Sequence, residues 1–278
     1  MVSAPNLRTY YAHLIAGKAG TSDQKLIDAF ATVERERFVG NGPWKVNCNA
    51  GCYVDTPSDD LAFLYQDVVV ALVPDRGLNN GEPSWHARCL AALDVRGGER
   101  TVHVGSGTGY YTAILAKLVG PTGAVVAYEI DRDLARRAAA NLETWPYVSV
   151  QGRSATEGVL PASDIIYASA GATRPPDTWL EALRPGGRLL FPLTPSVGLG
   201  GMLLVTRLSD TAFGARFVQP VAVIACEGAR NREEGDALSS AFARGNWSNV
   251  KSLRRGNPPD DSSWFTGDGW WLSTSENA

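Results

Sequence analysis

The most informative stretch of this chain for predicting its fold is Gly-Ser-Gly-Thr-Gly at residues 105–109. It follows a strand-like run at residues 100–104 and leads directly into an amphipathic, helix-like stretch at residues 110–119. Glycine suits such a turn because positive φ costs little without a Cβ, and because a ligand can approach the bare backbone closely. The order of strand, glycine turn and helix predicts the first βα unit of a nucleotide-binding sheet, whereas a glycine turn alone would fit a tight connection without a ligand.

A carboxylate follows in the place that such a unit requires. The apolar run at residues 124–128 ends at Glu129, and an acidic residue about 20 positions beyond the glycines accepts hydrogen bonds from ribose hydroxyls. The dinucleotide fingerprint is incomplete, because Tyr110 stands where its third glycine belongs and Gly109 comes one residue early. No Lys-Ser or Lys-Thr pair of a phosphate-binding loop follows the turn. We therefore predict a nucleoside ligand without phosphates, such as S-adenosylmethionine.

Strand-like and helix-like segments alternate through the middle of the chain. They cover residues 100–104, 110–119, 124–129, 132–143, 148–151, 164–168, 176–183 and 188–192. This alternation predicts an α/β fold with a doubly wound, mostly parallel sheet. Two further apolar runs, at residues 202–208 and 217–225, predict two later strands.

The N-terminal part differs from this pattern. Helical spacing of apolar residues predicts helices at residues 6–17 and 22–32, with Ser22 as the N-cap of the second. Residues 40–83, apart from 62–72, are rich in Gly, Asn, Pro and Asp, and we predict long loops around one short ordered segment at residues 62–72. A helix at residues 83–93 should lead to the first strand of the sheet.

Three stretches resemble the protein-L-isoaspartate O-methyltransferase family, within roughly residues 7 to 195. Residues 167–176 read Tyr-Ala-Ser-Ala-Gly-Ala-Thr-Arg-Pro-Pro, and residues 179–192 read Trp-Leu-Glu-Ala-Leu-Arg-Pro-Gly-Gly-Arg-Leu-Leu-Phe-Pro. The third stretch is Leu-Ile-Asp-Ala-Phe at residues 26–30, followed by Val33, Arg35, Phe38 and Val39. The resemblance implies a seven-stranded, Rossmann-like methyltransferase sheet that closes with an antiparallel strand pair. It also implies S-adenosyl-L-methionine as the cofactor.

The predicted cofactor site combines the glycine turn with the strand ends around it. Its candidate residues are His103, Gly105, Ser106, Gly107, Gly109, Tyr110, Glu129, Ile130, Ser154, Ala155 and Ala170. Two positions depart from the pattern of the family. His103 stands where the family has an acidic residue just before its glycine loop, and residues 152–154 read Gly-Arg-Ser in place of a Gly-Asp-Gly that approaches the adenine. We expect a modified cofactor pocket.

A larger departure falls on the loop that the resemblance assigns to the methyl acceptor. The family reads Thr-Ile-Ser-Gln/Ala-Pro there, whereas residues 79–83 read Asn-Asn-Gly-Glu-Pro, so that Gly81 replaces an active-site serine. The missing hydroxyl argues against simple repair of isoaspartyl residues in damaged proteins. Methyl transfer itself does not depend on that hydroxyl and remains the predicted reaction.

The catalytic candidates on this side are His86, Asn80 and Glu82. The side-chain amides of Asn79 and Asn80 can hold a carboxylate, which has no proton to lose at pH 7. For a hydroxyl or amine acceptor, Glu82 or His86 would be the natural base. The structural alternatives are a packed or surface histidine at position 86 and, for Glu82, a charge placed favourably at a helix N-terminus.

Composition limits the function classes. With 278 residues, of which 44% are hydrophobic, the chain can bury one substantial core. A net charge of −3 and a pI near 5.7 provide no basic field, which argues against a nucleic-acid partner. The sequence has no N-terminal signal pattern and no apolar run of ~18 residues, so we expect a cytoplasmic protein with no membrane partner.

We predict three regions: N-terminal helices and acceptor loops at residues 1–95, a cofactor-binding core at 96–227 and a C-terminal extension at 228–278. The extension is polar yet carries four tryptophans, Trp247, Trp264, Trp270 and Trp271. These rings either pack on the core or form a lid or an oligomer contact, for which a homodimer is the simplest case. Trp85 would form a further wall of the acceptor pocket, closed by this extension or by the loop at residues 40–60.

The four cysteines raise two alternatives to ordinary thiols, a zinc site and a disulfide. Cys48-x-x-x-Cys52 and His86-x-x-Cys89 could supply four zinc ligands, but the spacing lacks a Cys-x-x-Cys knuckle, so we predict no metal. A disulfide between Cys48 and Cys52 is the other alternative to ordinary thiols in a reducing compartment.

Three functions are compatible with the sequence. The first is a methyltransferase that acts on a carboxylate of a peptide or a small metabolite. The second is an O- or N-methyltransferase of a small molecule in secondary metabolism, for which the loss of the serine position is the main argument. The third is a non-catalytic domain that binds the nucleoside, against which the intact glycine turn and Glu129 argue. The fold alone cannot choose among acceptors.

Overall fold

The computed structural model describes residues 3–47 and 52–276. The chain divides into two compact units. Unit 1 consists of Met1–Gly98 and Ser106–Arg153, and unit 2 consists of Glu99–Gly105 and Ser154–Ala278.

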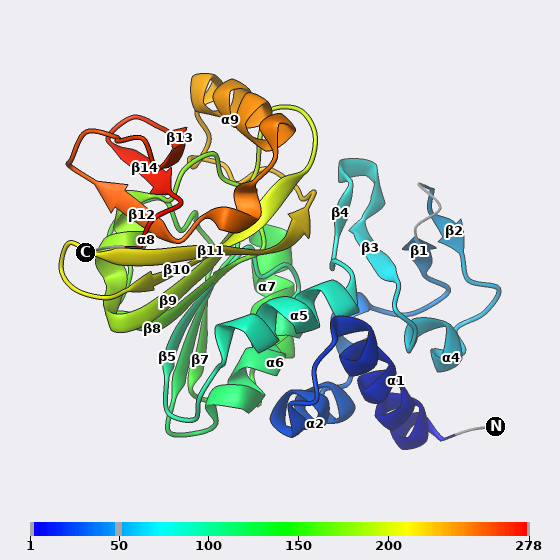
Figure 1. Ribbon diagram of the computed structural model, residues 1–278. Coiled ribbons are helices and arrows are strands. Elements are labelled where there is room, and N and C mark those ends of the chain that lie inside the picture. Colours follow the sequence, from blue (N-terminus) through cyan, green and yellow to red (C-terminus); the bar gives the residue numbers. More distant parts are fainter. Residues whose placement is uncertain (1–2, 48–51, 277–278) are drawn as a thin grey trace. The chain divides into compact units, whose positions relative to one another are not determined.

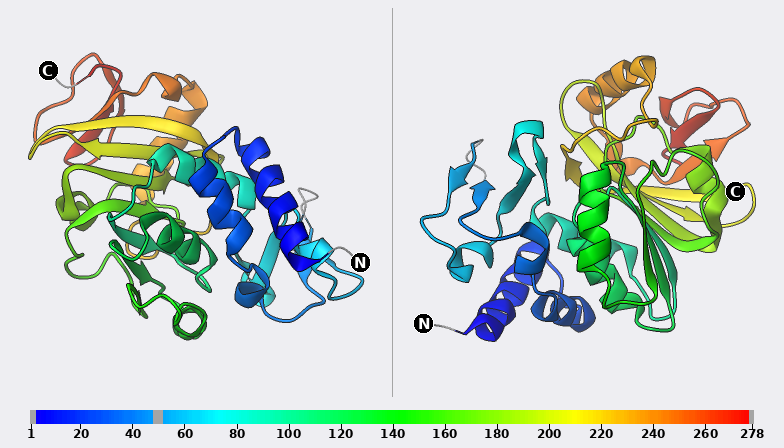
Figure 2. Two further views of the ribbon diagram at one scale, coloured as in Figure 1. Left: turned by 90° about the horizontal axis from the view of Figure 1, so that it is seen from below. Right: turned by 180° about the vertical axis from the view of Figure 1, so that it is seen from behind.

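The N-terminal helices of unit 1 confirm the helical spacing of the sequence. α1 (Ala4–Ala19) packs against α2 (Gln24–Thr32), as the left-hand view of Figure 2 shows, and α1 also packs against α5 (Pro83–Leu93). The prediction of Ser22 as the N-cap of α2 is wrong. Asp23 is the N-cap, and its Oδ1 accepts a 2.9 Å hydrogen bond from a backbone N–H of the first turn. Because an aspartate oxygen satisfies this N–H, the helix begins only after Asp23.

The described residues between 40 and 83 include a small antiparallel sheet, where the sequence predicted long loops around one short ordered segment at residues 62–72. Its strands, in the order β2-β1-β3-β4, are β1 (Lys45–Asn47), β2 (Val54–Asp55), β3 (Val69–Val73) and β4 (Leu78–Asn79). α3 (Glu36–Val39) lies just before this region, and α4 (Leu61–Leu64) and η1 (Pro74–Arg76) are short helical segments within it.

The small sheet has a core of its own, built from Trp44, Val46, Leu64, Val68 and Val70. Strands of 2 to 5 residues carry too few alternations to stand out from turn-forming residues. The pairing of Val46 with Val70 is also not local in the sequence. These two properties explain why the loop prediction failed here.

The glycine turn leads into α6 (Tyr110–Val119), as predicted. α6 packs on β6 (Ala124–Tyr128), and β6 pairs in parallel with β7 (Val148–Gln151). α7 (Arg132–Asn141) connects the two strands and packs against β7, as the right-hand view of Figure 2 shows. These elements are the βαβ unit that the sequence predicted.

Unit 2 is centred on three parallel strands in the order β5-β8-β9. They are β5 (Arg100–Val104), β8 (Ser163–Ala168) and β9 (Leu183–Leu193), with α8 (Asp177–Ala182) before β9. Beyond β9 the sheet continues antiparallel through β10 (Gly200–Arg207) and β11 (Phe213–Val221). Together with β6 and β7, these account for the seven strands that the resemblance implies, and the α/β fold class is confirmed.

The C-terminal extension continues the sheet of unit 2, as the orange and red ribbon in Figure 1 shows. Its elements are α9 (Arg232–Arg244), η2 (Trp247–Asn249), β12 (Ser252–Arg255), β13 (Ser263–Thr266) and β14 (Trp270–Ser273). β12 pairs antiparallel with β11, β14 with β12, and β13 with β14. Antiparallel pairing is therefore more extensive in this unit than the sequence predicted.

The tryptophans of the extension are mostly buried in unit 2. Trp264, Trp270 and Trp271 are buried, and the half-buried Trp247 packs on Phe217 with ring centroids 5.5 Å apart. The structure supports the packing interpretation for these rings rather than an exposed lid.

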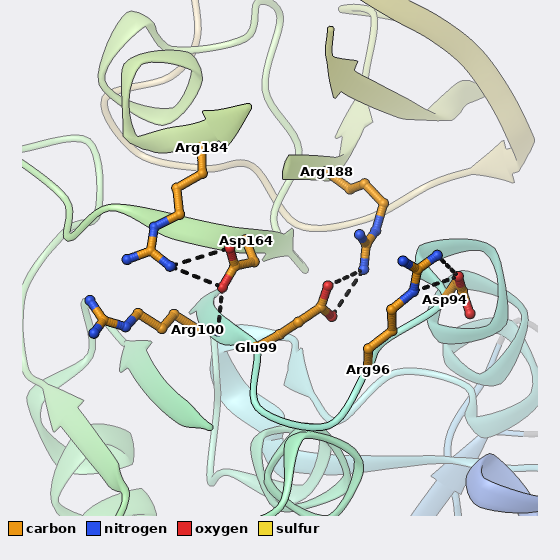
Figure 3. Close-up of polar contacts among 7 residues, drawn as sticks. All are labelled: Asp94, Arg96, Glu99, Arg100, Asp164, Arg184 and Arg188. Atoms are coloured by element: carbon orange, nitrogen blue, oxygen red, sulfur yellow. Dashed lines mark hydrogen bonds and ion pairs between the residues drawn. The ribbon is translucent and has the colours of Figure 1, made fainter. Parts of the chain in front are cut away.

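Ion pairs link residues near the amino ends of the parallel strands in unit 2, as Figure 3 shows. Asp164 of β8 accepts a 2.8 Å hydrogen bond from the N–H of Arg100, and its carboxylate lies 3.4 Å from the guanidinium of Arg184. Glu99 pairs with Arg188 of β9 at 2.8 Å. Ligands of open α/β sheets bind at the other, carboxyl ends of the strands. The ion pairs thus lie at the ends away from the predicted site residues.

Candidate cofactor and acceptor site

The glycine turn requires glycine at two positions of unit 1. Gly107 has a φ of 56° and Gly109 a φ of 97°, in the left-handed region that other residues rarely adopt. A Cβ on Gly109 would lie 2.8 Å from Cδ1 of Leu142. A 2.9 Å hydrogen bond from the N–H of Gly109 to the carbonyl of Ser106 closes the turn.

Glu129 follows β6 and faces this turn. Its Oε2 accepts a 2.7 Å hydrogen bond from the N–H of Gly107, and its Oε1 accepts one of 3.0 Å from the N–H of Asp131. Burial raises the pKa of Glu129 above its ordinary value, and these backbone N–H groups counteract the shift. Each carboxylate oxygen has a second lone pair, so Glu129 can still accept hydrogen bonds from a ligand.

The surroundings of Glu129 fit a nucleoside. The Oγ of Ser106 is buried and has no hydrogen-bond partner within the described part of the chain, so a ligand could satisfy it. Ile130, beside the carboxylate, is 47% exposed and presents an apolar surface. Tyr110 behaves differently, because its ring packs in the core against Phe30 and Phe38. Only its backbone remains for a cofactor contact.

In unit 2, the predicted cofactor residues around β5 and β8 are close to one another. Gly105 has a φ of 74°, and a Cβ there would lie 3.6 Å from the Cβ of Ala170. The side chain of His103 is buried; its Nε2 lies 3.1 Å from Oγ of Ser169 and its ring stacks on Tyr167. Burial lowers the pKa of His103 to about 3, so its imidazole is neutral at pH 7.

Residues 152–154, which replace the family's Gly-Asp-Gly, span the point in the sequence where unit 1 ends and unit 2 resumes. Side-chain contacts hold the segment in each unit. In unit 1, the guanidinium of Arg153 lies 4.9 Å from the ring centroid of Tyr128. In unit 2, Ser154 Oγ lies 2.8 Å from Oγ1 of Thr156, and the carbonyl of Ala155 accepts a 3.0 Å hydrogen bond from Nε1 of Trp179. The arginine is therefore placed against an aromatic ring.

Asn80 is held firmly in the acceptor loop of unit 1. Its N–H donates to the carbonyl of Val70 at 3.0 Å, and its Oδ1 accepts from the N–H of Val70 at 2.8 Å. Because a backbone N–H requires an acceptor, the second bond fixes which side-chain atom is the oxygen. The Nδ2 of Asn80 is buried and has no hydrogen-bond partner among residues 3–47 and 52–276. The hydrogen-bonding capacity of this donor is thus unmet within the described residues, in a side chain that belongs to a residue only 9% exposed.

His86 lies against the loop rather than at the surface. Its side chain is 4% exposed, and its ring stacks on Tyr111 with centroids 3.6 Å apart and an interplanar angle of 14°. The hydroxyl of Tyr111 is 3.5 Å from the carbonyl of Gly81. His86 is therefore a packed histidine, which was one of the structural alternatives for this residue.

Glu82 is the N-cap residue of α5 but makes no side-chain capping bond. Asp67 performs that task instead, accepting from Ser84 a 2.9 Å bond from N–H and a 2.7 Å bond from Oγ. Asp67 and Tyr111 were not predicted from the sequence. Both act through contacts between elements distant in sequence, for which the sequence gives no local signal.

Zinc ligands are not assembled in the described part of the chain. Those residues include no group of three or more His, Cys, Asp or Glu side chains that could hold a metal ion. Cys89 is buried in α5 and Cys52 is exposed, both as thiols. The predicted alternatives that involve Cys48 lie outside the described residues.

Comparison with known proteins identifies the family. The family model for Protein-L-isoaspartate(D-aspartate) O-methyltransferase (PCMT) matches residues 12–229. The chain belongs to this family. It is an S-adenosyl-L-methionine-dependent methyltransferase, as the glycine turn and Glu129 predicted.

Individual relatives agree with this assignment. The protein-L-isoaspartate O-methyltransferase of Anaeromyxobacter dehalogenans is 31% identical over 211 residues, covering 74% of this chain and 90% of that protein. That of Thermotoga maritima is 28% identical over 186 residues, covering 64% of this chain and 53% of that protein, so the match spans about half of this relative. A solved structure of a protein-L-isoaspartate O-methyltransferase shares the fold, with a TM-score of 0.68, 24% identity and coverage of 85% of this chain and 69% of that chain.

Among the residues that the structure describes, no helix combines the length and the apolar character needed to cross a membrane.

Proposed function

We propose that this methyltransferase esterifies a carboxylate of a peptide or protein. The observation that carries the proposal is the buried Nδ2 of Asn80, which has no acceptor within the described residues. A buried donor left without a partner costs about 1–3 kcal/mol. A carboxylate oxygen offsets that cost best, because hydrogen bonds to charged groups are stronger than those between neutral groups.

The cofactor residues of unit 1 support the donor side of the proposal. S-adenosyl-L-methionine supplies a methyl group that is already activated on a sulfonium. The free lone pairs of Glu129 would accept the ribose hydroxyls, and the hydroxyl of Ser106 would find a partner in the same ligand. Gly107 keeps the backbone of the turn open to close approach.

The acceptor side requires no general base under this proposal. A carboxylate has lost its proton at pH 7, so the chain must position it and exclude water. The packed ring of His86 and the N-cap position of Glu82 agree with such a role, because neither needs to remove a proton. Asn80 then orients the carboxylate, and His86 forms a wall beside it.

The proposal is tested with labelled cofactor and matched peptides. Three peptides of one sequence carry isoaspartate, aspartate or asparagine at a single position, with both termini blocked. Methyl esters release methanol in mild base, whereas N-methyl and ether products do not. We expect base-labile label on peptides with a free carboxylate, none on the asparagine peptide, and slow turnover of the isoaspartyl peptide because Gly81 lacks a hydroxyl. Base-stable label would instead indicate a hydroxyl or amine acceptor.

A further inference from the structure

The space for a side chain at position 81 is occupied by another residue. Gly81 has a φ of 71°, and a Cβ built on it would lie 2.2 Å from Nε2, 2.9 Å from Cδ2 and 3.4 Å from Cε1 of His86. Real Cβ atoms do not approach other heavy atoms to less than about 3 Å, since dispersion turns to steep repulsion there. The imidazole of His86 therefore lies where the side chain of residue 81 would begin.

Neither partner of this contact can move away easily. The imidazole is stacked on Tyr111 at 3.6 Å and meets the ring of Trp85 edge-on at 5.0 Å. On the other side, the hydrogen bonds between Asn80 and Val70 hold the loop one residue before Gly81. A side chain at position 81 and the observed position of His86 therefore exclude each other.

We infer that the imidazole of His86 replaces the side chain that is missing at position 81, and that the Gly81–His86 pair determines which carboxylate the enzyme accepts. This inference rests on the proposed carboxyl methylation. The stacked ring is larger than a serine side chain and fills the side-chain space of the residue that follows Asn80. An isoaspartyl carboxylate is attached to a carbon that carries both directions of the peptide chain, so it needs more room beside the carboxylate. The pair therefore selects against isoaspartyl acceptors.

Melting temperatures test whether positions 81 and 86 compete for the same space, and this measurement does not depend on enzyme activity. The four proteins of the cycle are the native enzyme, Gly81→Ala, His86→Ala and the double variant G81A/H86A. The strain that an alanine suffers from the positive φ at position 81 is present with or without His86, so it cancels in the cycle. We expect the double variant to melt at least about 4 °C above the temperature that additive effects predict, since His86→Ala removes the clash. Additive melting temperatures would show that the two positions do not compete for space.

Acceptor selectivity provides the second readout. The variant G81S/H86A restores a hydroxyl and removes the ring, with His13→Ala, an exposed histidine of α1, as the matched control. We expect its kcat/KM for the isoaspartyl peptide, relative to the aspartyl peptide, to rise at least about ten-fold, while the dissociation constant of S-adenosyl-L-methionine changes less than about two-fold. An unchanged ratio would overturn the selectivity role even if the melting cycle shows coupling.

The two readouts separate this inference from the proposed function. If no protein in the series, the native enzyme included, forms a base-labile ester on any peptide, then carboxyl methylation is wrong and the selectivity role falls with it. If esters form and only the ratio fails to respond, the function stands and His86 has a packing role alone.

Discussion

Residues 106–109 of the glycine turn, Glu129 and the acceptor loop at residues 79–86 all lie in unit 1, yet the turn and the loop use their polar groups differently. At the turn, both carboxylate oxygens of Glu129 already accept backbone N–H groups, at 2.7 and 3.0 Å, so the protein holds the carboxylate in place before any ligand binds. At the loop, the Nδ2 of Asn80 is buried with no acceptor among the described residues, and His86 fills the side-chain space of Gly81. The carboxylate at the turn is held by the protein, although the Oγ of Ser106 beside it has no partner within the described residues, whereas at the loop the unmet group is the donor of Asn80.

This difference between the two regions suggests that the turn binds the cofactor and that the loop selects the methyl acceptor. Under the proposed function, the carboxylate of Glu129 binds the cofactor, and the backbone of the βαβ unit holds it in place. An unmet donor beside a substituted position makes recognition depend on the acceptor. The two regions should therefore respond differently to substitution, with changes at the turn altering cofactor affinity and changes at the loop altering turnover.

The largest expected effect is on cofactor binding. Glu129→Ala removes the carboxylate that would accept the ribose hydroxyls, and we expect affinity for S-adenosyl-L-methionine to fall by about 1–3 kcal/mol, the usual contribution of a hydrogen bond to a charged group. Isothermal titration calorimetry measures it, with Glu143→Ala, an exposed residue, as the control. Unchanged affinity in Glu129→Ala, or tight NAD binding by the native protein, would contradict the assignment of the turn.

The next effect extends the comparison to unit 2, where a histidine replaces the family's acidic residue. The pKa of His103 is lowered to about 3 in the folded state, so the unfolded chain binds more protons below its ordinary pKa of 6.5. Its contribution to stability is therefore complete above pH 6.5 and is lost as pH falls toward 3. Between pH 7 and pH 5, we expect His103 to lower the free energy of unfolding by about 2 kcal/mol.

Denaturant unfolding of His103→Gln, which cannot titrate, tests this loss. The variant should show a shallower decline in stability over that pH range, and the exposed His13→Gln should follow the native protein. Equal slopes in all three proteins would mean that His103 is accessible to protons.

A smaller effect is expected at the acceptor loop. Asn80→Asp keeps the oxygen that accepts from the N–H of Val70 and replaces only the unpartnered donor. We expect turnover of a carboxylate acceptor to fall about ten-fold while cofactor affinity stays the same, because the two regions act separately. Asn41→Asp, an exposed change in the same unit, is the control. Loss of cofactor affinity in Asn80→Asp would show that the loop belongs to the cofactor site.

The smallest effect is the pH dependence of cofactor binding. Burial raises the pKa of Glu129 above the ordinary value of 4.5, so protonation of the free enzyme begins at a higher pH than for an exposed glutamate. The protonated form loses acceptor capacity, and affinity should weaken as pH falls through that range. Calorimetry from neutral to mildly acidic pH measures this, and Glu129→Ala should lose the dependence. A dependence that survives in the variant would belong to another group.

Sequence patterns predicted the parts of the molecule that rest on local chemistry. α5, α6 and β7 have the predicted bounds, because apolar spacing and a flanking glycine or proline are sufficient to mark them. The position of the glycine turn after a strand, and of Glu129 after the next strand, was likewise predicted from residue spacing alone. The approach of His86 to Gly81 was not, because it depends on how α5 packs against Tyr111 of α6.

The strands of the extension show a missed signal. Residues 267–269, between β13 and β14, read Gly-Asp-Gly, and Gly269 has a φ of 78°. A short glycine-containing connection between two aromatic runs is typical of a hairpin. The N-cap at Asp23 was harder to predict from the sequence, because Ser and Asp serve equally well at N-caps. The cap that Asp67 provides for α5 was also hard to predict, because the two residues in contact are distant in sequence.

The most direct test of the central claim is a crystal structure with S-adenosyl-L-homocysteine and an aspartyl peptide. We predict a carboxylate oxygen of the peptide within about 2.7–3.2 Å of the Nδ2 of Asn80, and ribose hydroxyls at hydrogen-bond distance from Glu129. A peptide carboxylate held by another segment, with the Nδ2 of Asn80 still unpartnered, would contradict the account.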